Sequence, residues 1–121
     1  NETKKIFHDD SIKVTATCVR VPVLRGHSES VNVETKKPFD ISEVKEAIKI
    51  AEGCVLMDDP KSLIYPTPIE VSGRGETFVG RIRRDESIEN GLNLWVVADN
   101  LLKGAAYNAV QIAQILIEKY L

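Results

Sequence analysis

The stretch FVGRIRRDESIENGLNLWVVADN, residues 78–100, decides the fold because it contains two strand patterns of different character. Residues 92–98 (LNLWVVA) are apolar almost throughout, which is typical of a strand at the centre of a sheet. Residues 77–83 alternate instead, as in a strand with two different faces. The alternation predicts Phe78, Gly80 and Ile82 on one face and Arg81 and Arg83 on the other.

Further strand patterns lie before this stretch. Residues 13–23 (KVTATCVRVPV) are rich in β-branched side chains and predict a strand with a proline near its end. Gly26 allows a turn, after which residues 27–34 (HSESVNVE) predict a second strand. Residues 54–57 (CVLM) predict a short buried strand, and the Pro- and Gly-rich loop that follows includes one possible extended piece at 69–71.

Two helices are expected. Residues 40–51 begin with Asp40 and carry Glu43 three positions later, the pattern of a capping box, and Gly53 suits the left-handed residue after a helix. Residues 99–121 predict a long helix. Its expected inward stripe is Ala106, Ala109, Val110, Ala113, Leu116, Ile117 and Tyr120, with Asn108, Gln111 and Glu118 opposite.

The order of elements predicts an α+β fold, with a mixed, largely antiparallel sheet and two helices on one face. The other face must then be polar or covered by something else. With 121 residues of ordinary globular composition, the chain suits a single domain, residues 1–121, and residues 1–10 are a polar tail of an upstream element.

Composition argues against several classes of partner. A net charge of −2 gives no basic excess for a nucleic acid, and no apolar run approaches the roughly 20 residues of a membrane span. Cys18 and Cys54 lie in apolar runs and are interpreted as buried, reduced and inert, which favours a cytoplasmic location. The first residue is Asn1 and the single methionine is Met57, so we interpret the chain as part of a longer protein.

Arg20 and His27 are the main candidates for chemistry. Arg20 lies in an apolar run and offers a planar fork of donors that matches a carboxylate. His27 follows a turn, and imidazole transfers protons near neutral pH. A hairpin around residues 21–26 would bring the two together. The alternative is structural: Arg20 pairs with Glu29, and His27 is an ordinary hydrogen-bonded histidine.

Other polar groups give weaker signals. The run RIRRD (81–85) is interpreted as a solvated or interface strand face rather than an anion site. No acidic or histidine cluster has metal-ligand spacing, so no metal site is predicted. Asn100 stands where a helix should begin, and a cap and a ligand contact are equally consistent with that position.

Three stretches together resemble the C-terminal half of bacterial aspartate-semialdehyde dehydrogenases: residues 15–34 (TATCVRVPVLRGHSESVNVE), 78–100 and 101–113 (LLKGAAYNAVQIA). The resemblance extends over residues 13–117 and, less closely, to the catalytic domain of glyceraldehyde-3-phosphate dehydrogenase. It implies an enzyme that reduces β-aspartyl phosphate with NADPH through a cysteine thioester, in aspartate-family amino-acid biosynthesis.

The resemblance also implies roles for single residues. Arg20 matches the arginine that binds the substrate's carboxylate, His27 the acid/base histidine, and Asn100 the residue that contacts the nicotinamide end of NADP. The family's nucleophilic cysteine motif and Gly-rich dinucleotide turn do not occur in these 121 residues. The chain alone is therefore expected to be inactive and to bind no cofactor. It would be a C-terminal substrate-binding and dimerisation domain whose NADP-binding domain is missing.

In the family the uncovered sheet face packs against a second copy, so we expect a homodimer, with Arg81, Arg83 and Asn93 at the interface. Two alternatives remain at this point. One is the related N-acetylglutamyl-phosphate reductase, which the stretch GLNLWVVADNLLKGAA (91–106) fits poorly. The other is a non-catalytic dimerisation or amino-acid-binding module, in which Arg20 would still bind a carboxylate.

Overall fold

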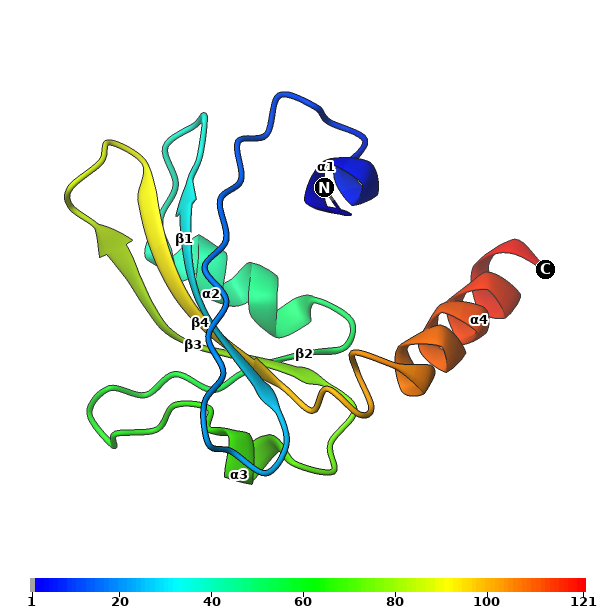
Figure 1. Ribbon diagram of the computed structural model, residues 1–121. Coiled ribbons are helices and arrows are strands. Elements are labelled where there is room, and N and C mark those ends of the chain that lie inside the picture. The colour runs from blue at the N-terminus through cyan, green and yellow to red at the C-terminus, as the bar shows by residue number, and fades with distance from the viewer. Residues whose placement is uncertain (1) are drawn as a thin grey trace.

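A four-stranded sheet in the order β1-β4-β3-β2 forms the centre of the computed structural model, which describes residues 2–121 (Figure 1). The strands are β1 (His27–Glu34), β2 (Cys54–Leu56), β3 (Thr77–Asp85) and β4 (Gly91–Ala98). β4 pairs antiparallel with both β1 and β3, and β2 pairs parallel with β3. The mixed α+β sheet is as predicted, and the apolar run 92–98 lies inside it.

Within residues 2–121, four helices accompany the sheet: α1 (Glu2–Phe7), α2 (Ile41–Ile50), α3 (Pro68–Val71) and α4 (Ala106–Tyr120). α2 begins at the predicted capping box, in which the Asp40 N–H donates to Glu43 Oε2 at 3.3 Å. Gly53, at φ 75°, takes the left-handed conformation expected just after the helix. Local sequence signals therefore account for the start and the end of α2.

Each face of the sheet has its own apolar cluster. On the α2 face, Val79, Ile82 and Leu92 are buried against side chains of α2 such as Val44 and Ile48. We call the opposite face, which α2 does not cover, the open face. One part of it carries a second apolar cluster, which α3 and the loop between β2 and α3 cover. Its members are Val71, Phe78 and Val97, with Val55, Met57 and Trp95 packed against them.

The predicted strand 13–23 does not form. Residues 12–21 carry no regular secondary structure, and β1 is the edge strand because its one partner is β4. High β-propensity produces a strand where a neighbour accepts its backbone hydrogen bonds, and here none does. The exposed side chains of Val19 and Cys18 show that the segment is not core, so the prediction that Cys18 is buried is also wrong.

Two smaller predictions also need correction. Residues 69–71 were expected to be extended, but they belong to the short helix α3, in which Pro68 occupies the first turn. Ile82 was grouped with Phe78 on one face, yet it is buried with Val79 on the α2 face. A β-bulge just before it reverses the alternation. Asn1, the first residue of the predicted polar tail, lies outside the described residues.

The last helix begins later than expected and does not cover the sheet. α4 starts at Ala106 rather than near Asp99, and Figure 1 shows it projecting away from the sheet. Every residue of its predicted inward stripe is exposed, whereas Asn108 and Gln111, predicted to lie opposite, are half-buried. Gln111 Oε1 accepts a hydrogen bond from Lys103 Nζ at 2.8 Å. The second helix of the predicted two-helix layer is therefore turned outward.

Candidate functional site

The start of β1 and the end of β4 form a polar junction that contains two of the three predicted site residues. His27 lies opposite Ala98 in the antiparallel ladder, so the residues on either side of this pair are also neighbours. Asn100 Oδ1 accepts a hydrogen bond from the backbone N–H of Gly26 at 2.8 Å. This bond links Asn100 directly to the residue that precedes His27.

Gly26 is the residue type that this turn requires. Its φ of 97° lies in the left-handed region, and a Cβ there would lie 3.2 Å from the Cβ of Pro68. The turn brings the Gly26 N–H to Asn100 and leads directly into His27, whose side chain is exposed. The predicted acid/base residue, His27, is therefore an exposed side chain at the first position of β1, directly after this turn.

Asp99 connects this turn to the rest of the domain. Its side chain is fully buried and is paired with Arg25, the residue before Gly26. The same carboxylate accepts hydrogen bonds from the N–H of Gly73 at 2.6 Å and of Leu101 at 3.0 Å. A single buried anion thus holds the β1 turn, the segment after α3 and the turn after β4.

The surroundings of Asp99 favour its charged form. Burial raises its pKa, but the N–H groups of Gly73 and Leu101 and the Arg25 guanidinium together lower the pKa below its usual 3.8. Since a buried charge is stable when it is paired and hydrogen-bonded, Asp99 is a permanent anion at neutral pH. Sequence reasoning missed both Asp99 and Arg25. A charged residue directly after the apolar run VVA (96–98) was the available signal.

Arg20 is not part of this junction and lies in a stretch without regular secondary structure. It is exposed on the extended segment, and the predicted hairpin between residues 13–23 and β1 is absent because β1 pairs with β4 alone. Among residues 2–121 there is no ion pair between Arg20 and Glu29, so the structural alternative for Arg20 does not hold either. Within the described part of the chain its guanidinium remains available to a ligand.

Part of the open face carries polar groups of both signs. Asn32 Nδ2 donates to Asp85 Oδ2 at 2.6 Å and to Asn93 Oδ1 at 3.1 Å. Arg83 lies opposite Asn93 in the ladder, so it shares this face. Hydrogen bonds from Ser87 and Asn32 lower the pKa of Asp85. The predicted interface residues Arg83 and Asn93 are therefore neighbours on a polar surface.

Residues 2–121 contain neither a metal cluster nor a membrane-spanning helix. No group of three or more His, Cys, Asp or Glu side chains there is arranged to hold a metal ion. Among residues 2–121, no helix has both the length and the apolar character needed to cross a membrane.

Known proteins with similar sequences agree on one family. Residues 1–103 match the model of the semialdehyde dehydrogenase dimerisation domain. The aspartate-semialdehyde dehydrogenase of Aquifex aeolicus is 55% identical over 118 residues, which are 98% of this chain and 35% of that protein. That of Bacillus subtilis is 51% identical over 94% of this chain and 33% of its own length.

Solved structures agree as well. The chain superimposes on aspartate semialdehyde dehydrogenase II from Vibrio cholerae with a TM-score of 0.89 and 48% identity, over 99% of this chain and 35% of that one. For the Francisella tularensis enzyme the TM-score is 0.84 at 32% identity, over 96% and 33%. The chain spans about a third of the length of the relatives it matches, and it belongs to the semialdehyde dehydrogenase dimerisation-domain family.

Proposed function

We propose that this chain is the C-terminal, substrate-binding and dimerisation part of an aspartate-semialdehyde dehydrogenase that uses NADPH to reduce β-aspartyl phosphate. The relatives at 51–55% identity that carry this name support the substrate class. The structural observation that carries the proposal is the hydrogen bond from Gly26 to Asn100. It holds an exposed histidine and a half-buried amide at one edge of the sheet, as a site for proton transfer beside a nicotinamide requires.

His27 is the proposed acid/base residue. His27 is exposed at the start of β1, directly after a turn that Arg25, Asp99 and Asn100 hold in place. Its backbone is therefore fixed, and its imidazole is accessible to a substrate. In the reaction His27 takes the proton of the attacking thiol and returns a proton to the product. The thiol belongs to a part of the enzyme beyond these 121 residues, because neither Cys18 nor Cys54 lies in the motif expected of the nucleophile.

Arg20 is the proposed substrate-binding residue. Its guanidinium is exposed and makes no ion pair within the described residues, so both arms of the fork are available. A bidentate contact with the α-carboxylate would orient the substrate as well as bind it.

Asn100 fits a contact with the nicotinamide of NADP(H). Its Oδ1 accepts from Gly26, which leaves the Nδ2 donors to face the carboxamide oxygen of the ring. When bound, the cofactor supplies the hydride. Its phosphates need a Gly-rich turn that these residues do not contain, so the isolated chain should bind the cofactor poorly.

Two surfaces of the domain suit partners of different kinds. The outward apolar stripe of α4, which includes Val110, Leu116 and Ile117, would be covered by the NADP-binding domain of the same enzyme. The polar open face, with Arg83, Asn93 and Asp85, would meet the same face of a second copy and make a homodimer.

The test is NADP- and phosphate-dependent oxidation of aspartate semialdehyde, measured on a full-length enzyme containing this chain and on the isolated 121 residues. We expect activity in the former and none in the latter. Activity of the isolated chain would contradict the proposed division of the active site. Preference of the full-length enzyme for N-acetylglutamate semialdehyde would contradict the proposed substrate while leaving the reaction class intact.

A further inference from the structure

A β-bulge in β3 determines which face of the sheet its arginines occupy. Two residues of β3, Arg81 and Ile82, lie opposite the single residue Leu94 of β4. Strict alternation without this extra residue would place Arg81 and Arg83 on the face that α2 covers, among apolar side chains. With the bulge, Ile82 enters that core at 7% exposure, and Arg83 lies on the open face.

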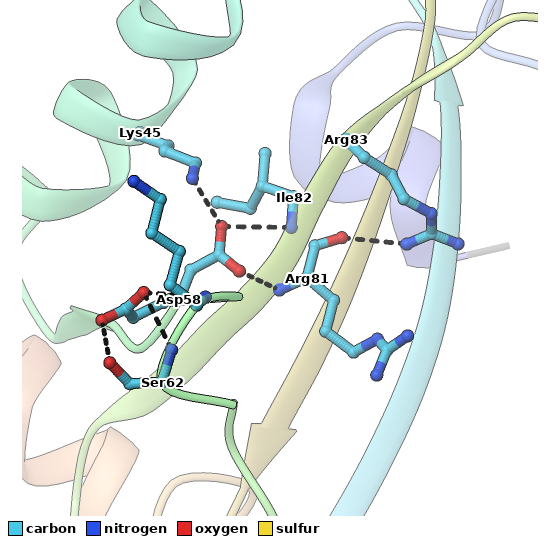
Figure 2. A network of polar contacts seen from close by, with 8 residues as sticks. Lys45, Asp58, Ser62, Arg81, Ile82 and Arg83 are labelled. Atoms are coloured by element: carbon cyan, nitrogen blue, oxygen red, sulfur yellow. Dashed lines mark hydrogen bonds and ion pairs between the residues drawn. The ribbon is translucent and has the colours of Figure 1, made fainter. Parts of the chain in front are cut away.

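The carboxylate of Asp58 holds the bulge in place, as Figure 2 shows. Its Oδ1 accepts the N–H of Arg81 at 2.7 Å, and its Oδ2 accepts the N–H of Ile82 at 3.4 Å. These are the backbone donors at the break in the ladder. Lys45 of α2 pairs with Oδ2 at 2.8 Å, and the side chain of Asp58 is 2% exposed. One buried anion thus stabilises the irregular backbone and ties it to α2.

The backbone at Arg81 adopts a strained conformation. Its φ of 51° is left-handed, a conformation that glycine adopts freely and that costs other residues about 1–2 kcal/mol. Such strain persists where the surroundings over-determine the backbone and is common at functional sites. The Asp58 contacts fix this conformation, and the residue held in it is a long cation rather than glycine.

Both arginines are directed away from the carboxylate that positions them. Figure 2 shows the side chains of Arg81 and Arg83 extending away from Asp58 and Lys45. The Arg81 guanidinium lies 5.5 Å from the centre of the Tyr65 ring. Arg81 and Tyr65 both border a shallow hollow of about 300 Å³.

Arg83 lies beside Asn93 on the open face, where Asp85 supplies an acidic group. The face therefore presents cations and an anion within one patch. A patch with both signs of charge can complement its own copy across a twofold axis, where one surface meets itself.

We propose that Asp58 is a positioning residue for homodimerisation: by holding the bulge, it presents Arg81 and Arg83 to a second copy of this chain. The inference rests on the proposed dimer. It adds that Asp58, which lies outside the interface, controls which side chains reach it. Lys45 neutralises the carboxylate from α2, and the contact with the bulge itself is made by the two backbone N–H groups. Loss of Asp58 would let β3 return to regular pairing, which would move the arginines off the open face.

The experiment measures the dimer dissociation constant of the 121-residue chain by sedimentation equilibrium, with a thermal melt of each variant. D58N is expected to weaken the dimer at least about tenfold. The control change D10N, at an exposed carboxylate on the turn after α1, should leave the dissociation constant within about threefold. R81A and R83A each remove a guanidinium from the open face and should weaken the dimer. The thermal melts report any separate loss of stability, since Arg83 Nη1 also donates to the Arg81 carbonyl and Arg81 lies over the Tyr65 ring. Adding R83A to D58N should add little, because the two changes remove the same contact.

The outcomes are distinct. A wild-type chain that stays monomeric would sink the proposed dimer, and the inference with it. A wild-type dimer that D58N leaves intact would overturn the inference alone. If D58N does not fold, R81A and R83A decide, since unchanged dimerisation in both would show that the arginines are not at the interface.

Discussion

Arg25 and Asp99 form an ion pair in which the carboxylate is fully buried and the guanidinium reaches the surface. The pair joins the turn before β1 to the residue after β4, 74 positions apart in the sequence. The Arg25 Nε is itself buried without a hydrogen-bond partner, so the single bond of its Nη2 to Asp99 carries the contact. This pair and the Asn100–Gly26 hydrogen bond are the framework on which His27 stands.

Replacing Asp99 by Asn should destabilise the domain strongly. The change leaves the partly buried Arg25 without an anion and turns one oxygen that accepts a backbone N–H into a donor. We expect the melting temperature to fall by several degrees in a calorimetric scan. D10N is the matched control, because Asp10 is an exposed carboxylate on the turn after α1. Equal melting temperatures for the two variants would show that the Asp99 network contributes nothing.

The same carboxylate should make stability depend on pH in the acid range. Since the folded-state pKa of Asp99 lies below its usual 3.8, the charged form contributes stability that is fully present above that value. This stability is lost as pH falls through the folded-state pKa. Asp9, Asp59 and Asp85 also have lowered pKa values, so the wild-type curve alone is not specific. The difference between wild type and D99N, from urea melts at pH 2 to 6, isolates Asp99 and should shrink below pH 4. A stability difference between wild type and D99N that stayed constant from pH 6 to pH 2 would contradict the predicted role of Asp99.

Replacing His27 by Asn should remove proton transfer without disturbing the fold. The side chain is exposed, and its backbone pairing with Ala98 is unaffected by the change. In a full-length enzyme we expect kcat to fall by roughly 100- to 10,000-fold, the usual contribution of a general acid/base. H8N is the control, because His8, on the turn after α1, is the only other histidine of the chain. Equal losses in both variants would point to a fold defect rather than to chemistry.

Replacing Arg20 by Lys should impair substrate use more than folding. Lysine keeps the charge but cannot form the bidentate fork, so the carboxylate contact loses one charged hydrogen bond. We expect kcat/KM for aspartate semialdehyde in the full-length enzyme to fall by about 10- to 100-fold. The melting temperature should not change, because Arg20 makes no ion pair within residues 2–121. An unchanged kcat/KM would remove Arg20 from the site.

Local patterns predicted the elements whose causes are local. The α2 capping box, the left-handed Gly53 and the central position of 92–98 all follow from neighbouring residues. The errors arise where distant residues decide. The bulge in β3 depends on Asp58, more than 20 residues earlier, and the alternation of 77–83 gives no sign of it.

The candidate site divides in the same way. Its residue type and its place after a turn predict His27, and in the structure its side chain is exposed beside that turn. That Asn100 binds the preceding residue depends on which strands pair, because β1 and β4 are over 50 residues apart. The segment 13–23 had the propensity of a strand, but propensity does not supply a partner.

Gly80 offers a last test, of the close packing on the open face. A Cβ at this position would lie 2.2 Å from the carbonyl oxygen of Met57 and 2.7 Å from Pro66, so the neighbouring backbone would have to move. Gly80→Ala should therefore destabilise the domain by about 3 kcal/mol or more, because backbone rather than a flexible side chain must move. Gly73→Ala is the comparison, since a Cβ there meets nothing within 4 Å and the cost is limited to its left-handed φ of 83°, about 1–2 kcal/mol. Urea melts of both variants measure the difference. If Gly80→Ala lowered the free energy of unfolding no more than Gly73→Ala, the loop that carries Met57 and Pro66 would be easily displaced. It could then not fix the position of the side chains around Arg81.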